Sequence, residues 1–147
     1  MTDLEKVHIK LGLSGTYWDK RPQYRVEYND TVVCQGTISG DTDQVEYLEF
    51  DCEYADDVVL KVFLTNKTNS DTVENEDKTA IVKDMLLNID SIKIDEIDIS
   101  ELKWSASEFV ADDPNRPTLQ KCVNLGWNGS YRLKFTCPFY LWLLEKL

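Results

Sequence analysis

The sequence predicts an all-β fold, an antiparallel two-sheet β-sandwich of the jelly-roll type, with a short apolar segment at its C-terminal end. Apolar and polar residues alternate with a period of two in most of the patterned segments, as in half-buried strands. Turn-forming residues separate about seven or eight such segments, and no long stretch has helical periodicity. The 147 residues fit one domain, for which we expect a core over 7–99, then a loop, a final strand and the apolar tail over 100–147.

The first half of the chain has the clearest strand patterns. Residues 7–13 place Val, Ile and Leu on one face, and residues 24–38 alternate on both sides of an Asn-Asp dipeptide that favours a tight hairpin turn. Residues 45–54 alternate as well. Residues 57–65 carry apolar side chains on both faces, which predicts a central strand buried from two sides.

The second half is less regular. Residues 66–79 form a polar stretch that contains a single aliphatic residue and predicts a solvated loop. Residues 85–94 predict a strand whose alternation shifts phase near Ser91, as a β-bulge would cause. Residues 105–124 have no clear pattern, and we expect a final strand over 130–136.

The charge of the chain excludes some partners. Acidic residues number 27 and basic residues 16, which gives a formal net charge of −11. Nucleic acids and anionic membrane surfaces need clustered Lys and Arg, so neither is an expected partner. We also expect no membrane insertion, because no apolar stretch approaches the ~20 residues of a spanning helix, and the N-terminus has no signal-peptide pattern.

Catalysis is not predicted, and no catalytic residue is proposed. The one histidine, His8, lies on the polar face of the first expected strand, away from any Ser-His-Asp or Cys-His arrangement in the sequence. The glycines form no phosphate-binding loop. Carboxylates are numerous, but no spacing singles out a glycosidase pair. A hydrolase with an unrecognised carboxylate pair therefore ranks last among the hypotheses.

The four cysteines lie at positions 34, 52, 122 and 137, and none forms a C-x-x-C pair. This spacing does not predict a zinc site. Cys34 and Cys52 fall in expected strands, where a cysteine behaves as a small buried apolar residue. We favour reduced thiols over a disulfide framework, which is typical of smaller secreted domains.

The acidic polar loop and the strand after it are the best candidate for a metal site. Calcium takes 6–8 oxygen ligands from carboxylates, carbonyls and waters. The candidate ligands are Asn66, Asp71, Asp77, Asp84, Asn88 and Asp90. Their spacing differs from that of an EF-hand loop, and the alternative is a solvated acidic loop without metal. The sequence therefore predicts either no cofactor or one calcium ion.

Two groups of apolar residues lie outside the alternating pattern. Tyr17, Trp18 and Trp127 stand beside glycines and turn residues, where exposed rings stack on ligands, although they could also cap the sandwich. The second group is at the C-terminal end. It is expected to pack on its own sandwich or on a neighbouring subunit of a homo-oligomer. These interface candidates are Phe139, Leu141, Trp142, Leu143 and Leu144.

The order of strands and two short motifs resemble a known family. One strand ends in Phe63-Leu64-Thr65-Asn66-Lys67, and a later one begins with Val82-Lys83-Asp84 and continues to Ile89. Over residues 7–94 the chain resembles the calcium-dependent xylan-binding modules, jelly-roll domains appended to plant-cell-wall hydrolases. In that family a Phe-x-Asn-Asp strand end and an Arg-Asp-x-x-x-Asp strand frame a calcium ion that contacts the sugar.

The resemblance has consequences for particular residues. It places Asn66 and Asp84 at positions that line the calcium site of the family. Lys67 and Asn88 stand where the family has aspartates. The loss of these two carboxylates predicts weak or absent calcium binding, and an ammonium at Lys67 would repel the ion unless the side chain folds outward.

A second resemblance concerns residues 126–147, which begin Gly-Trp-Asn-Gly-Ser-Tyr-Arg-Leu-Lys-Phe. They are similar to small proteins of tailed bacteriophages that infect marine cyanobacteria. This resemblance implies a virion component made in the host cytoplasm, with other virion proteins or surface carbohydrate as partners. The leading hypothesis is thus a non-enzymatic virion accessory or adhesion protein, and the alternative is a calcium-dependent carbohydrate-binding module.

Overall fold

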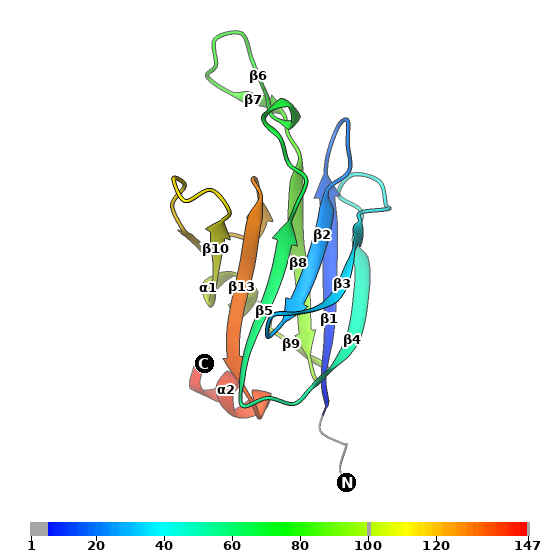
Figure 1. Ribbon diagram of the computed structural model, residues 1–147, viewed down its shortest axis with the longest axis vertical. Coiled ribbons are helices and arrows are strands. Elements are labelled where there is room, and N and C mark those ends of the chain that lie inside the picture. The colour runs from blue at the N-terminus through cyan, green and yellow to red at the C-terminus, as the bar shows by residue number, and fades with distance from the viewer. Residues whose placement is uncertain (1–5, 100, 147) are drawn as a thin grey trace.

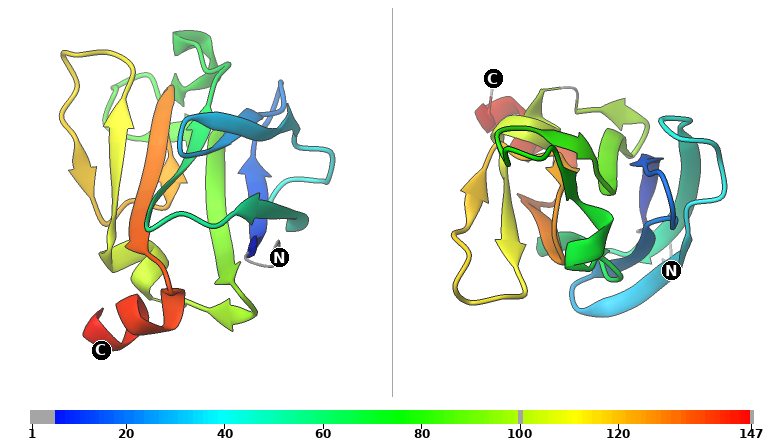
Figure 2. Two further views of the ribbon diagram at one scale, coloured as in Figure 1. Left: turned by 60° about the horizontal axis from the view of Figure 1, so that its bottom comes forward. Right: turned by 90° about the horizontal axis from the view of Figure 1, so that it is seen from above.

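The computed structural model describes residues 6–99 and 101–146, and these form two antiparallel sheets packed face to face. Figure 1 shows the strands running along the long axis of the molecule, and Figure 2 shows the two layers from other directions. The predicted two-sheet β-sandwich is confirmed. No helix among the described residues is long and apolar enough to cross a membrane.

The strands divide between the two large sheets and one small one. The first sheet has the order β12-β8-β1-β4, with β9 paired to β8, and the second has the order β11-β10-β13-β5-β2-β3. The first contains β1 (Lys6–Thr16), β4 (Glu46–Glu53), β8 (Leu86–Ile94), β9 (Ile97–Asp98) and β12 (Asn124–Leu125). The second contains β2 (Gln23–Tyr28), β3 (Thr31–Thr37), β5 (Asp57–Leu64), β10 (Ser107–Ala111), β11 (Leu119–Gln120) and β13 (Gly129–Thr136).

Short elements cap the sandwich at its two ends. A two-stranded hairpin, β6 (Val73–Glu74) with β7 (Ile81–Lys83), projects beyond the sheets at the top of Figure 1, and a 3-10 turn, η1 (Asn69–Asp71), precedes it. The helices α1 (Leu102–Ser105) and α2 (Phe139–Lys146) lie lower in the same view. The strands after residue 101 join both sheets, because β12 pairs with β8 while β13 lies between β10 and β5.

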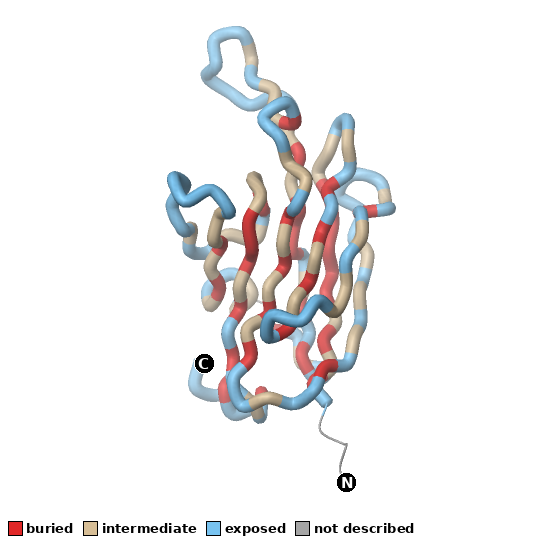
Figure 3. Tube along the Cα trace, viewed as in Figure 1, coloured by how far each residue is buried: buried red, intermediate tan, exposed pale blue. Residues whose placement is uncertain are grey.

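The core follows from the alternation read in the sequence. In β1, Val7, Ile9, Leu11 and Leu13 are at most 1% exposed, and they belong to the same buried cluster as the alternate residues of β5. Figure 3 shows buried and exposed positions alternating along these strands, while the loops at the upper end are exposed. The burial of such side chains contributes roughly 1.5–3 kcal/mol each, which makes the sandwich a stable base for its loops.

Two local predictions agree with the structure. Asn29 and Asp30 both have positive φ angles, 47° and 68°, as the hairpin turn between β2 and β3 requires. The register of β1 against β8 shifts between Gly12 and Leu13, opposite Ser91, where the phase of the alternation changes. Gly12 is needed there, because an added Cβ would lie 2.5 Å from the Ser91 Oγ.

Two other predictions need correction. β5 is central, but its outward face is only half-buried, because Phe63 is covered by the Arg25 guanidinium at 4.1 Å and not by another layer. Residues 105–124 were expected to be irregular, yet they contain β10 and β11. These strands are short and include few inward apolar side chains, so their alternation is hard to recognise in the sequence.

The C-terminal apolar segment forms α2 and packs on its own sandwich by one face. Phe139 and Trp142 are buried, and their ring centroids lie 5.3 and 6.2 Å from that of Phe135. Leu141 and Leu144, by contrast, are 48% and 64% exposed, and Leu143 is half-buried. Of the five interface candidates, Phe139 and Trp142 therefore pack against their own sandwich. For the other three, a role between subunits stays a prediction.

We predict that Trp142→Ala lowers the free energy of unfolding by about 3 kcal/mol, because it leaves a cavity beside Phe135 and Phe139. The matched control is Leu144→Ala on the exposed face of the same helix, which should change it by less than about 0.5 kcal/mol. Urea unfolding measures both. Equal effects from the two substitutions would contradict the internal packing of α2.

Candidate functional site

A cleft of about 670 Å³ opens at the end of the sandwich that carries the polar loop. Three connections far apart in the sequence form its walls: the segment from β5 to β8, the loop after β10 and the loop before β13. The lining residues are Lys67, Thr68, Asn69, Thr72, Glu74, Ile81, Asp84, Asp112, Asp113, Arg116, Gly126, Trp127 and Asn128. The size lies within the range of small-molecule sites in proteins.

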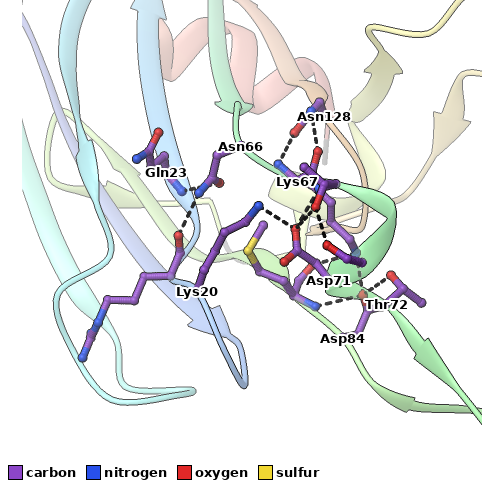
Figure 4. Close-up of polar contacts among 12 residues, drawn as sticks. Lys20, Gln23, Asn66, Lys67, Asp71, Thr72, Asp84 and Asn128 are labelled. Atoms are coloured by element: carbon purple, nitrogen blue, oxygen red, sulfur yellow. Dashed lines mark hydrogen bonds and ion pairs between the residues drawn. The ribbon is translucent and has the colours of Figure 1, made fainter.

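Lys67 and Asp84 form an ion pair on the wall of this cleft. The Lys67 Nζ lies 2.5 Å from the Asp84 Oδ1 and also donates a hydrogen bond of 2.8 Å to the Met85 carbonyl oxygen (Figure 4). The Lys67 side chain is 7% exposed, so the ammonium folds inward. The same Asp84 oxygen accepts hydrogen bonds from the Thr72 hydroxyl at 2.7 Å and the Met85 amide at 2.8 Å.

Asn128 fixes the backbone of Lys67 from the other side. Its Oδ1 accepts a hydrogen bond of 2.7 Å from the Lys67 amide, and its Nδ2 donates one of 3.0 Å to the Lys67 carbonyl. The loop before β13 is thereby joined to the end of β5. Together with the ion pair, these bonds connect the three chain segments that meet at residue 67.

A second ion pair joins Asp71 to Lys20. The Asp71 Oδ2 accepts hydrogen bonds from the Thr68 amide at 2.7 Å and the Thr68 hydroxyl at 3.1 Å, and the Lys20 Nζ lies 2.9 Å away. Its backbone carbonyl accepts a hydrogen bond of 2.9 Å from the Trp18 Nε1. The turn between β1 and β2 is thus attached to the polar loop.

Burial and hydrogen bonding act in opposite directions on these two carboxyl groups. Burial alone would raise the pKa of Asp84, but the hydrogen bonds from Lys67, Thr72 and the Met85 amide outweigh it and lower the pKa. The pKa of Asp71 is lowered in the same way, since the bonds from Lys20 and Thr68 outweigh its desolvation. Both carboxylates are therefore held in the ionised form.

The structure does not bring the six calcium-ligand candidates together. The Asn66 amide bonds to the Gln23 amide at 2.9 Å and the Arg21 carbonyl at 3.0 Å, away from Asp84 (Figure 4). The Asn88 amide bonds within the first sheet, and the side chains of Asp77 and Asp90 are exposed. Among the described residues, no group of three or more His, Cys, Asp or Glu side chains could hold a metal ion.

The residues at the expected ion position do not fit calcium. The ion needs 6–8 oxygen ligands, with carboxylates supplying most of the charge. Here the Lys67 ammonium already donates hydrogen bonds to two of the available oxygens, one of the Asp84 carboxylate and that of the Met85 carbonyl. A positive charge at that distance from these oxygens would repel a divalent cation.

The three candidate stacking residues differ in their surroundings. The Tyr17 hydroxyl donates to the Gly40 carbonyl at 2.8 Å, and Trp18 is tied to the polar loop by its Nε1, so both stand outside the cleft. Trp127 lines the cleft, with its ring stacked on Phe109. Its Nε1 is buried without a hydrogen-bond partner among the described residues.

The sequence reasoning missed the residues of the other cleft wall. Asp112, Asp113 and Arg116 come from the loop after β10, and the Arg116 guanidinium lies 4.4 Å from the Trp127 ring centroid. With Lys67 and Asp84 paired, the cleft keeps three carboxylates, those of Glu74, Asp112 and Asp113, and one guanidinium. The run Asp-Asp-Pro-Asn-Arg-Pro over residues 112–117 is typical of a loop and carries no sign of a binding site.

Comparisons with known proteins bear on the fold. No protein-family model and no curated protein matches the chain. The structure of vCBM60 in complex with galactobiose is similar, with a TM-score of 0.55 and 12% identity over 86% of this chain and 96% of that chain. The selenomethionine form of vCBM60, described in work linking two families of calcium-dependent carbohydrate binding modules, is also similar. It has a TM-score of 0.56 and 12% identity over 86% of this chain and 89% of that chain.

At this identity the likeness shows the fold. It supports the resemblance to calcium-dependent carbohydrate-binding modules at the level of the sandwich, and the similar structures are of a binding module, not of a catalytic domain. The resemblance to phage proteins gains no support from these findings.

We predict that Lys67→Met lowers the free energy of unfolding by about 3 kcal/mol, because it leaves the Asp84 carboxylate partly buried without its cation. Lys61→Met is the matched control. It removes a lysine from the pair with Asp30, which is 82% exposed, and should cost less than about 1 kcal/mol. Chemical denaturation of the two variants gives the comparison, and a loss at Lys67 no larger than at Lys61 would contradict the described pairing.

We also predict that the protein loses stability in acid. The pKa values of Asp71 and Asp84 are lower in the folded chain than their ordinary value of 3.8, so the unfolded chain binds more protons. The stabilisation is therefore complete above about pH 5 and is lost as the pH falls through 4 and below. Urea unfolding from pH 7 to pH 2.5 should show this slope, and Asp84→Asn should flatten it. An unchanged slope in Asp84→Asn would contradict the assignment.

Proposed function

We propose that the protein is a non-catalytic carbohydrate-binding module and that its loop-end cleft binds a neutral saccharide. The observation that carries this proposal is the cleft itself. It is open, about 670 Å³ in volume and lined by charged, amide and hydroxyl groups beside one aromatic ring. The sandwich beneath it is similar to that of vCBM60, which has been solved with galactobiose.

The lining suits sugar hydroxyls, each of which both donates and accepts hydrogen bonds. The carboxylates of Asp112, Asp113 and Glu74 are acceptors, and the Arg116 guanidinium is a donor. Trp127 stacks on Phe109 and lies under the Arg116 guanidinium, so its ring holds that donor at the wall of the cleft. Such a mixture is poor for an apolar ligand, because its polar groups would lose water without new partners.

The charge of the cleft favours a neutral ligand over an anionic one. Three carboxylates stand against one guanidinium once Lys67 and Asp84 are paired. An acidic sugar would meet a net negative wall, and the net charge of −11 on the whole chain would add to the repulsion.

The hydrolase hypothesis receives less support. A glycosidase needs one carboxylic acid whose pKa is raised so that it can protonate the leaving group. At Asp84 the hydrogen bonds lower the pKa, so this carboxyl does not suit the role of the acid. The virion role and the virion location predicted from the sequence stay predictions, and the carbohydrate-binding alternative agrees better with the similarity of fold.

We predict that the protein binds a neutral polysaccharide and that Arg116→Ala weakens binding at least about tenfold, because it removes the guanidinium that lines the cleft beside Trp127. Arg132→Ala on β13, outside the cleft, is the matched control and should bind as the wild type does. Affinity electrophoresis in gels containing xylan, galactan or β-glucan, with polygalacturonate as the anionic comparison, identifies the ligand, and calorimetry then measures the two variants.

Two results would overturn the proposal. One is the absence of binding to every neutral polysaccharide and to an array of oligosaccharides. The other is wild-type affinity in Arg116→Ala, which would place any binding outside this cleft.

A further inference from the structure

We infer that the Lys67 ammonium serves as a cation built into the chain, in place of the calcium ion expected at this position, and that the site works without metal. The expectation that a saccharide contacts this ammonium rests on the proposed function. The replacement of the metal rests on the geometry around residue 67 and is tested separately.

The surroundings of the ammonium are those of a cation site. Its two protein partners are oxygens, one from a carboxylate and one from a backbone carbonyl, at 2.5 and 2.8 Å. The carboxylate of Asp84 is itself positioned by the Thr72 hydroxyl and the Met85 amide. Carboxylate and carbonyl oxygens are also the groups that hold a hard metal ion, and here a single side chain occupies them.

Two lysines balance the charges of the two partly buried carboxylates, Asp71 and Asp84. Asp84 is paired with Lys67 at 2.5 Å, and Asp71 with Lys20 at 2.9 Å. The side chain of Asp71 is 5% exposed and that of Asp84 21%, so neither can rely on water to compensate its charge fully. Since these two carboxylates already have their cations, neither is free to bind a divalent ion.

The ammonium also keeps a donor for a ligand. An ammonium has three N–H donors, and two of those of Lys67 go to Asp84 and Met85. Lys67 lines the cleft with 7% of its side chain exposed, and we assign the third donor to a sugar hydroxyl of the bound ligand. A fixed charge with one open position is the role that a metal ion plays when it contacts a ligand directly, and it requires no free calcium.

The first test uses calcium alone, with no saccharide present. The wild type should keep the same melting temperature in 5 mM EDTA and in 1 mM calcium chloride. Lys67→Asp exchanges the ammonium for a carboxylate beside Asp84, so it should melt lower in EDTA and recover by at least about 3 °C in calcium. Lys61→Asp is the matched control. It makes the same change of charge at a residue of β5 whose partner, Asp30, is exposed, and its melting temperature should not respond to calcium.

The outcomes of this test are decisive in either direction. Calcium that stabilises the wild type, or a Lys67→Asp variant that melts lower yet ignores calcium, overturns the inference, because the lysine would then not stand in for an ion. If Lys67→Asp fails to fold in EDTA, it is refolded in calcium and its metal content is measured. Folding with bound calcium supports the inference, and failure in both conditions overturns it.

The second test needs a saccharide bound by the wild type. Binding should be unchanged in EDTA, whereas Lys67→Met should lose at least about tenfold in affinity at a temperature where it is still folded. Binding abolished by EDTA would overturn the inference while leaving the proposed function intact. Conversely, the absence of any saccharide ligand would defeat the proposed function and leave the calcium test standing.

Discussion

The loop end of this protein is organised around one partly buried charge pair. The Lys67 ammonium meets the Asp84 carboxylate and the Met85 carbonyl, while Asn128 holds the backbone of Lys67 from a third segment. Desolvating two charges is costly and is offset only where the geometry is good and the remaining oxygens are hydrogen-bonded. The Thr72 hydroxyl and the Met85 amide supply those bonds to the Asp84 carboxylate.

The two sheets make this arrangement possible. Alternate residues of β1 and β5 bury a continuous apolar core, which leaves the connections at one end to carry polar and charged groups. Function in such folds lies in the site grafted on the scaffold rather than in the scaffold itself. The similarity to vCBM60 at 12% identity concerns the sandwich, whereas the pair of Lys67 with Asp84 belongs to the loops that this chain carries on it.

Much of the fold could be predicted from the sequence, because local rules decide it. Alternation determined which residues of β1 face the core, and the positive φ angles of Asn29 and Asp30 agree with the expected turn. The helix α2 was missed because an eight-residue apolar segment has no distinctive period. Its two faces became visible only once Phe135 was seen to cover Trp142.

The candidate site was less predictable, since it depends on where side chains point and which distant loops meet. Asn66 and Asn88 were plausible ligands by their place in the sequence, yet their amides bond to other backbone and side-chain groups. Arg116 reaches the cleft from a loop that nothing in the sequence linked to residue 67. The direction of the Lys67 side chain was also open, and the structure shows that it points inward.

A crystal structure of the wild-type protein grown in millimolar calcium tests most directly whether the Lys67 ammonium takes the place of a calcium ion. If the ammonium replaces an ion, the Lys67 Nζ stays within hydrogen-bond distance of the Asp84 Oδ1 and the Met85 carbonyl oxygen, with no anomalous scattering peak beside them. A calcium peak bound by Asp84, with the Lys67 side chain turned out into solvent, would contradict it.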